Sequence, residues 1–411
     1  DFSVRTMGLT GLGALGVAFG NVLAMDSPAA RDPGAFHWGS TLWHEIAHAF
    51  TLGMTRHRIP RWLTEGISVR EERRSRPGWG EPVSFAFLQA FHQDMLLPMA
   101  RIDAGFVRPS YPGQVGVSYQ HGSVAVELIE RDWGDATLRR MLDAYRAGHG
   151  TEAVFRDVLG TGLDAFDRRL DAYVRERYAA GLAAAASLTG SGDAPHPGVV
   201  STAGAGGGIE ARLAAADDAP DSFGAQLAAG TALFEAGRLA EAGPYLERAL
   251  ELYPEFVGPG SPYALLAAVR TEQGDLAGAA TLLRRLTALD ESALEANLTL
   301  AGVLTELGDR AGAADALERA VFIYPYDADP HRRLAELAAE LGRPALEVRE
   351  RRAILALDPV DRAGALYDLA VAQRRAGDPA AARRTVMSAL EIAPSFAAAQ
   401  ELLLELAGGG G

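Results

Sequence analysis

The sequence has no cysteine among its 411 residues. Disulfide bonds and thiol catalysis are therefore excluded, and any metal site has to use histidine, aspartate or glutamate. A positive charge balance is also missing, because 39 basic residues face 53 acidic ones and the formal net charge is −14. Proteins that bind nucleic acids need a basic surface, so we expect no nucleic-acid partner. The remaining composition, 48% hydrophobic and 22% charged, is that of a globular protein with room for about two to three domains.

Long uncharged runs are scarce as well. Only residues 7–25, MGLTGLGALGVAFGNVLAM, have the length to cross a membrane. The four glycines from Gly8 to Gly16 suit turns and strands better than a helix, so we expect no membrane span, with a signal-peptide core as the alternative. The chain begins with Asp1 rather than methionine, which indicates a sequence cut inside a domain, with its true N-terminus missing. An exported or periplasmic location is favoured over a cytoplasmic one.

Periodicity and turn residues divide residues 1–180 into a strand pair and several helices. The strand pair is predicted within 1–26, as a strand, a glycine-rich turn and a second strand. The predicted helices cover 36–53, 61–74 and, with breaks near Gly134 and 148–150, 119–178. This mixture predicts an α+β domain over 1–180.

An alanine- and glycine-rich stretch and a periodic region follow. Residues 181–208 contain little that could form a core, so they are predicted to be a linker. Beyond them glycine recurs at intervals of 37, 34, 34 and 35 residues, and in four of the five units proline follows the glycine by 17 residues. The recurring glycines are Gly237, Gly274, Gly308, Gly342 and Gly377.

This period resembles the tetratricopeptide repeat, a helix–turn–helix unit of about 34 residues. The resemblance covers about 223–411 and implies an all-α solenoid over 209–411, with about five units and a capping helix at 395–407. Its concave face would hold a protein partner. The second and fourth units depart from the pattern, and in the fourth Glu347 and Arg351 stand where small and apolar residues are expected.

The segment TLWHEIAHAF, at 41–50, raises the question of a metal site. His44 and His48 are four residues apart and share one face of a helix, and Glu45 beside them can reach a water without being a ligand. The alternative is an ordinary helix whose histidines form hydrogen bonds. The neighbouring side chains are apolar, which predicts a helix buried almost all round, in which histidines need partners. These neighbours are Trp43, Ile46, Ala47 and Phe50.

A third ligand is available in PRWLTEGISVREE, at 60–72. Glu65 follows His48 by 17 residues, and a tight reversal through 53–60 would bring it beside the histidines. Two histidines and one glutamate leave a fourth position for water, which is typical of catalytic zinc, whereas structural sites are closed by four protein ligands. We therefore expect one Zn²⁺ per chain at His44, His48 and Glu65.

The HEIAH and WLTEG motifs resemble those of the gluzincin metallopeptidases, most closely the peptidase-MA-like domains. The resemblance covers about 1–180 and implies an α+β zincin-like domain that is incomplete at its N-terminus. It implies zinc ligands at His44, His48 and Glu65, with Glu45 as general base. The activity it implies is hydrolysis of peptide bonds in a peptide or protein by Glu-assisted attack of a zinc-bound water.

Relatives also place a tyrosine at the start of a later helix. Tyr119 is therefore our candidate donor to the oxyanion, with His121 as its competitor. Thermolysin-like enzymes carry an aspartate one turn after the third ligand, where this chain has Val69. Glu71 or Glu72 could orient a ligand instead, although a solvated charge run is favoured. His57 is predicted to be an exposed loop residue.

The strand before the active-site helix bears on specificity. Aminopeptidase relatives carry a glutamate there that binds the substrate's free amine, and Gly20 stands in its place. We therefore expect a peptidase that is not a dedicated aminopeptidase, with 16–24 as an edge strand that could pair with an extended peptide. The rival hypothesis is a non-catalytic repeat scaffold with an inactive, metal-binding remnant of the peptidase fold.

Overall fold

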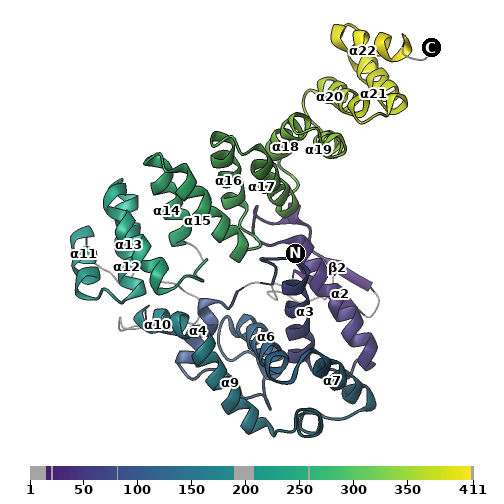
Figure 1. The fold of residues 1–411 in the computed structure, drawn as a ribbon. Coiled ribbons are helices and arrows are strands. Elements are labelled where there is room, and N and C mark those ends of the chain that lie inside the picture. Colours follow the sequence, from purple (N-terminus) through teal and green to yellow (C-terminus); the bar gives the residue numbers. More distant parts are fainter. Residues whose placement is uncertain (1–14, 20–21, 81, 189–207, 258–259, 409–411) are drawn as a thin grey trace. The chain divides into compact units, whose positions relative to one another are not determined.

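The computed structural model of the chain describes residues 15–19, 22–80, 82–188, 208–257 and 260–408 (Figure 1). They form two compact units. The first contains the described residues up to Asp26 together with Trp38–Glu291, and the second contains Ser27–His37 and the described residues from Ser292 onward. This described part is mostly helical, and none of its helices combines the length and hydropathy that crossing a membrane requires.

The strands form a hairpin. β1 (Gly16–Phe19) pairs antiparallel with β2 (Val22–Met25), so that Gly16 faces Met25. The predicted single strand over 16–24 is therefore wrong, because this stretch contains two short strands that pair with each other. An apolar run without alternation does not reveal such a reversal. The earlier predicted strand and its glycine-rich turn lie largely outside the described residues.

The first unit places its helices close to the predicted ranges, with the expected interruption at Gly134, whose φ is 80°. Further short helices lie in 76–113, where no element was predicted. Up to residue 188 the helices of this unit are α2 (Trp38–Thr55), α3 (Arg61–Ser75), α4 (Phe85–His92), α5 (Ala104–Val107), α6 (Gln114–Trp133), α7 (Asp135–Ala147), α8 (Thr151–Val154), the π-helix η2 (Phe155–Leu159), α9 (Leu163–Arg177) and α10 (Ala179–Leu188).

The reversal between α2 and α3 is made by residues in the left-handed region. α2 continues two residues past the predicted stop at Gly53, and ends where Arg56 and His57 adopt φ values of 54° and 59°. His57 is exposed there, as expected. A residue from another segment of the chain fixes the start of α3.

The N-terminus of α3 is capped by Asp103. Pro60 precedes the helix and offers no side-chain cap, so the first amides need another acceptor. The amide of Trp62 donates to Asp103 Oδ1 at 2.8 Å. This contact fixes the first turn of α3 in place. Glu65 follows Trp62 by three residues, so its position depends on the same contact.

α3 crosses α6 at a pair of glycines. A Cβ at Gly66 would lie 2.4 Å from the carbonyl oxygen of Gly122, and one at Gly122 would lie 2.6 Å from the carbonyl oxygen of Trp62. Only glycine permits so close an approach of two helix backbones. Since Gly66 directly follows Glu65, this crossing also positions the predicted third ligand.

We expect Gly66→Ala to destabilise the protein by about 1–3 kcal/mol or more, because the new methyl group overlaps helix backbone that cannot move aside. Gly116→Ala on α6 is the matched control: nothing lies within 4 Å of its Cβ, and alanine favours a helix. Thermal unfolding followed by circular dichroism measures both. Equal melting temperatures for the two variants would contradict the close crossing.

The repeat region consists of paired helices, as its period predicted. Each pair is joined at one of the five recurring glycines, whose φ values of 64° to 78° are those of a left-handed helix end. The described pairs are α12 (Phe223–Glu235) with α13 (Leu239–Leu252), α14 (Pro262–Glu272) with α15 (Leu276–Leu289), α16 (Leu294–Glu306) with α17 (Arg310–Ile323), α18 (Ala328–Glu340) with α19 (Pro344–Ala356), and α20 (Arg362–Arg375) with α21 (Pro379–Ile392), preceded by α11 (Ile209–Asp218) and followed by α22 (Ala397–Gly408).

The first two helix pairs share the hydrophobic core of the first unit. Phe85 on α4 lies 6.4 Å from Tyr253 and 6.1 Å from Phe256, between ring centroids. The stretch predicted as a linker begins with the alanine-rich helix α10, which packs against α4 and α12, and its residues 189–207 lie outside the described ones. The division between the compact units thus follows Glu291, within the repeats.

In the second unit the irregular fourth repeat is held by ion pairs. Glu347 is buried and accepts a hydrogen bond from Arg375 at 2.8 Å, and Arg351 donates to Asp368 at 2.9 Å. Both contacts join α19 to the next helix, α20. Ion pairs here replace the small and apolar contacts of a regular repeat.

Candidate metal centre

Side chains of α2 and α3 converge on one point. Glu65 Oε2 lies 3.1 Å from His44 Nε2 and 3.0 Å from His48 Nε2. Among the described residues, this is the group of three ligand-type side chains whose donor atoms all lie within 4.8 Å of one another. The structure thus brings the three sequence-predicted ligands together.

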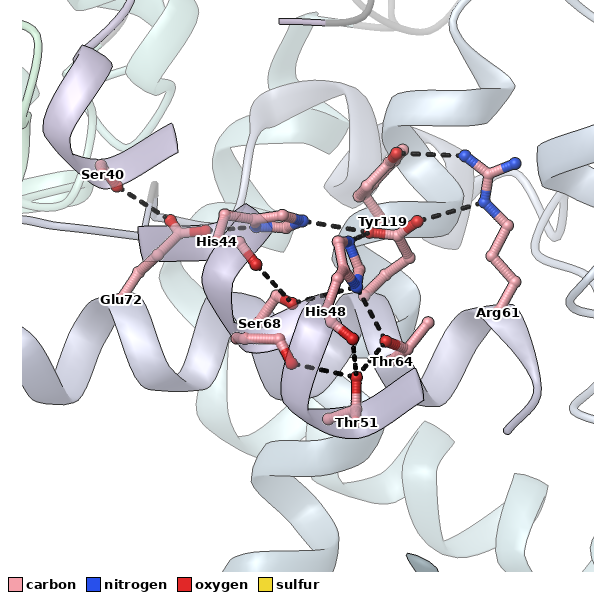
Figure 2. Close-up of polar contacts among 11 residues, drawn as sticks. Ser40, His44, His48, Thr51, Arg61, Thr64, Ser68, Glu72 and Tyr119 are labelled. Carbon is pink, nitrogen blue, oxygen red and sulfur yellow. Dashed lines mark hydrogen bonds and ion pairs between the residues drawn. The ribbon is translucent and has the colours of Figure 1, made fainter. Parts of the chain in front are cut away.

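His44 is held from the side opposite Glu65. Its Nδ1 pairs with Glu72 Oε1, and the other oxygen of Glu72 accepts a hydrogen bond from Ser40 Oγ at 3.1 Å (Figure 2). Glu72 is buried, so its assignment to a solvated charge run is wrong. It lies seven residues after Glu65, on the face of α3 that packs on α2, whereas Glu71 pairs with Arg70. A carboxylate on the second nitrogen of a histidine orients the ring and makes it a better ligand.

His48 is oriented by hydroxyl groups. Its Nδ1 lies 2.7 Å from Thr64 Oγ1 and 3.3 Å from Ser68 Oγ, and Thr64 Oγ1 lies 2.7 Å from Thr51 Oγ1 (Figure 2). These contacts hold the ring with Nε2 turned toward Glu65.

Tyr119 and Arg61 complete the site beside Glu65. Arg61 Nε donates to Glu65 Oε1 at 3.1 Å, and Arg61 Nη2 donates to the Tyr119 hydroxyl at 3.3 Å (Figure 2). The ring of Tyr119 lies 6.3 Å from that of His44. Its competitor His121 lies instead against Phe87 of α4, at 6.3 Å, and burial lowers the pKa of His121 to about 4.

Glu45 lies one residue round the helix from His44 and is buried between α2 and the hairpin. A Cβ at Gly16 of β1 would lie 2.6 Å from Glu45 Cγ, so the strand passes directly beside the Glu45 side chain. Glu45 Oε2 is buried without a hydrogen-bond partner among the described residues. Burial, partly offset by the nearby histidines, raises the pKa of this carboxyl group.

The electrostatics of the cluster favour a cation. Burial opposes charge on His44, but hydrogen bonds and charges from Glu65 and Glu72 outweigh it and raise the pKa of His44 to about 10. Burial also opposes charge on Glu65, yet hydrogen bonds from His44 and His48 hold the pKa of Glu65 well below its usual range. The two carboxylates thus favour positive charge on the His44 ring. A zinc ion would supply that positive charge, and two imidazole nitrogens with one carboxylate oxygen are a ligand set that zinc accepts.

The outer face of α2 differs from the prediction. Trp43 and Phe50 are 42% and 66% exposed, so the helix is not buried all round. Glu45 and His48, by contrast, are buried. Apolar residues around the motif therefore do not show that the whole surface of the helix is buried.

Sequence reasoning also missed the groups that hold the ligands. Two hydroxyls of the hydrogen-bond network stand about one helical turn from a ligand: Ser40, which donates to Glu72, precedes His44 by four residues, and Ser68, which contacts His48, follows Glu65 by three. Arg61 likewise precedes Glu65 by four. Spacing at one helical turn was the signal that could have found them.

Family models match both of the regions that the sequence analysis distinguished. The model of the Peptidase MA superfamily matches residues 14–176, and that of the tetratricopeptide repeat matches 209–255 and 266–328. The comparison with curated proteins gave no match.

Several solved structures resemble the chain at low scores. The protein YrrB, described as a TPR protein with an unusual peptide-binding site, is 19% identical with a TM-score of 0.36, covering 47% of this chain and 97% of its own. A MamA protein is 20% identical with a TM-score of 0.31, covering 39% and 86%, and MamA 41-end from Desulfovibrio magneticus RS-1 is 18% identical with a TM-score of 0.29, covering 41% and 92%. Scores this low carry no argument about function. On the family models, the chain contains a Peptidase MA superfamily domain at residues 14–176, followed by tetratricopeptide repeats.

Proposed function

We propose that this chain is a zinc-dependent peptidase of the gluzincin type. His44, His48 and Glu65 hold one zinc ion, and Glu45 is the general base. The observation that carries the proposal is the convergence of three ligand atoms beside a buried carboxylate oxygen that has no hydrogen-bond partner among the described residues. A structural metal site has no need of that fourth acidic group.

Different groups carry out the separate steps of hydrolysis. When bound, zinc lowers the pKa of a water molecule and polarises the substrate carbonyl. Glu45 takes a proton from the attacking water and passes it to the leaving amine. Burial suits Glu45 to this task, because a raised pKa brings a carboxyl group closer to the operating pH.

The Tyr119 hydroxyl donates a hydrogen bond to the carbonyl oxygen as negative charge develops on it. Arg61 supports this role: a guanidinium group has only donors, so the Tyr119 oxygen accepts from it and keeps its own proton for another acceptor.

The repeat array, in this proposal, recruits a protein substrate or partner. Tetratricopeptide helices stack into a curved surface that is suited to holding protein segments. The acidic balance of the chain supports a protein rather than a nucleic-acid partner. The location remains a prediction, with export or the periplasm favoured.

Cleavage of an unfolded protein tests the proposal. We expect the purified full chain, loaded with about one zinc per chain, to degrade a denatured general substrate such as casein, to stop when a chelator removes the metal, and to recover when zinc is restored. Released peptides are measured by fluorescence, with metal content by mass spectrometry on the same samples. Zinc without cleavage would favour the non-catalytic scaffold.

A further inference from the structure

The two carboxylate oxygens of Glu65 have different partners. Oε2 faces the Nε2 atoms of His44 and His48 at 3.1 and 3.0 Å, whereas Oε1 accepts a hydrogen bond from Arg61 Nε at 3.1 Å. Only one oxygen is therefore presented to the other ligand atoms. The carboxylate could rotate to offer both oxygens if Oε1 were released.

The same guanidinium group also reaches Tyr119. Arg61 Nη2 donates to the tyrosine hydroxyl at 3.3 Å, so one side chain bridges Glu65 on α3 and Tyr119 on α6 (Figure 2). Arginine can make this bridge because its donors are fixed in one plane, whereas a lysine ammonium is a single charged centre.

Arg61 is itself held in place. It is the first residue of α3, and its guanidinium carbon lies 5.2 Å from the ring centre of Phe106. Its side chain is 42% exposed, but that of Glu65 is only 5% exposed. The contact thus differs from an ordinary i,i+4 pair on a helix surface, where both groups are solvated and the pair contributes little.

We propose that Arg61 is a positioning residue of the metal centre, which restricts Glu65 to one metal-facing oxygen and fixes the Tyr119 hydroxyl beside it. The inference rests on the proposed function, because it takes Glu65 as a zinc ligand. Arg61 acts through Glu65 and Tyr119.

The test uses metal binding by the full chain with Arg61→Met and Arg61→Lys. Methionine keeps an apolar stem against Phe106 and removes every donor, whereas lysine keeps the charge without the bridge. We expect Arg61→Met to weaken zinc binding by about 10–100-fold, as is usual when a group that orients a ligand is lost. The visible spectrum of the cobalt-substituted protein should change as well, since it reports the coordination geometry. Arg61→Lys should give a smaller loss of affinity with the same direction of spectral change.

Arg58→Met is the matched control, because Arg58 is exposed and donates to the carbonyl of Arg146 at 2.9 Å. It should bind zinc and cobalt as the parent does. Parent-like zinc affinity and cobalt spectrum in Arg61→Met would overturn the inference. If that variant does not fold by circular dichroism, Arg61→Lys decides on the same two readouts.

Both readouts are independent of cleavage. If Arg61→Met lowers zinc affinity but the parent chain cuts no peptide, the role of Arg61 stands and the peptidase is refuted. If the parent chain cuts peptides but Arg61→Met leaves metal binding unchanged, the peptidase stands and the role of Arg61 is refuted.

Discussion

Exchanging Glu45 for glutamine is expected to lower peptide cleavage by about 10²–10⁴-fold or more, the range assigned to general acid–base catalysis, while zinc content and melting temperature stay near the parent values. Glutamine has almost the same volume as glutamate, and Glu45 is not one of the three residues whose donor atoms converge. Its amide cannot accept a proton from water. Turnover of a susceptible peptide and metal content by mass spectrometry are measured on the same preparations.

Glu71→Gln is the matched control for Glu45→Gln. Glu71 is partly exposed and pairs with Arg70, away from the ligand atoms, so its variant should cleave as the parent does. Parent-like turnover of Glu45→Gln would remove Glu45 from the mechanism. Loss of zinc together with activity would instead place Glu45 among the ligands.

Removing any one of the three ligands should weaken zinc binding by more than about 100-fold, beyond the 10–100-fold typical of groups that only orient a ligand. His44→Ala, His48→Ala and Glu65→Ala each leave two of the three donor atoms that the structure brings together. Competition titration against a chromophoric chelator measures the affinities of the full chain.

Two further variants test how far zinc binding depends on residues that are not ligands. Glu72→Gln should weaken zinc binding less than His44→Ala, by about 10–100-fold, because it removes only the carboxylate charge beside His44 Nδ1. His57→Ala should bind zinc as the parent does, since His57 is an exposed residue of the turn after α2. Tight zinc binding by Glu65→Ala would mean that the third ligand is another acidic residue.

The helical spacing of the motif residues was enough to predict which side chains meet. His44 and His48 lie on one helix face by periodicity alone, and a short reversal had to return Glu65 to that face. Their roles as ligands remain a proposal. Glu72 could not be chosen from the sequence, because its neighbours Glu71 and Arg73 read as a solvated charge run. Only the packing of α3 on α2 buries it beside His44.

The repeats could be predicted because each unit contacts mainly its neighbours, so that local periodicity determines the structure. The division into compact units could not. It depends on contacts such as that of Phe85 with Tyr253, which lie far apart in the sequence and leave no periodic signal. The hairpin of 16–25 was missed for a related reason, since its two strands lack the alternation of apolar and polar residues that marks a half-buried strand.

The most direct test of the account is to map new peptide termini in a broad peptide library by mass spectrometry. The zinc-loaded parent chain and Glu45→Gln are compared at equal zinc content. We predict many new termini with the parent, none above background with Glu45→Gln, and none with the parent after chelation. A parent preparation that carries about one zinc per chain and yields no new termini would contradict the peptidase, and would leave a metal-binding scaffold as the better description of the chain.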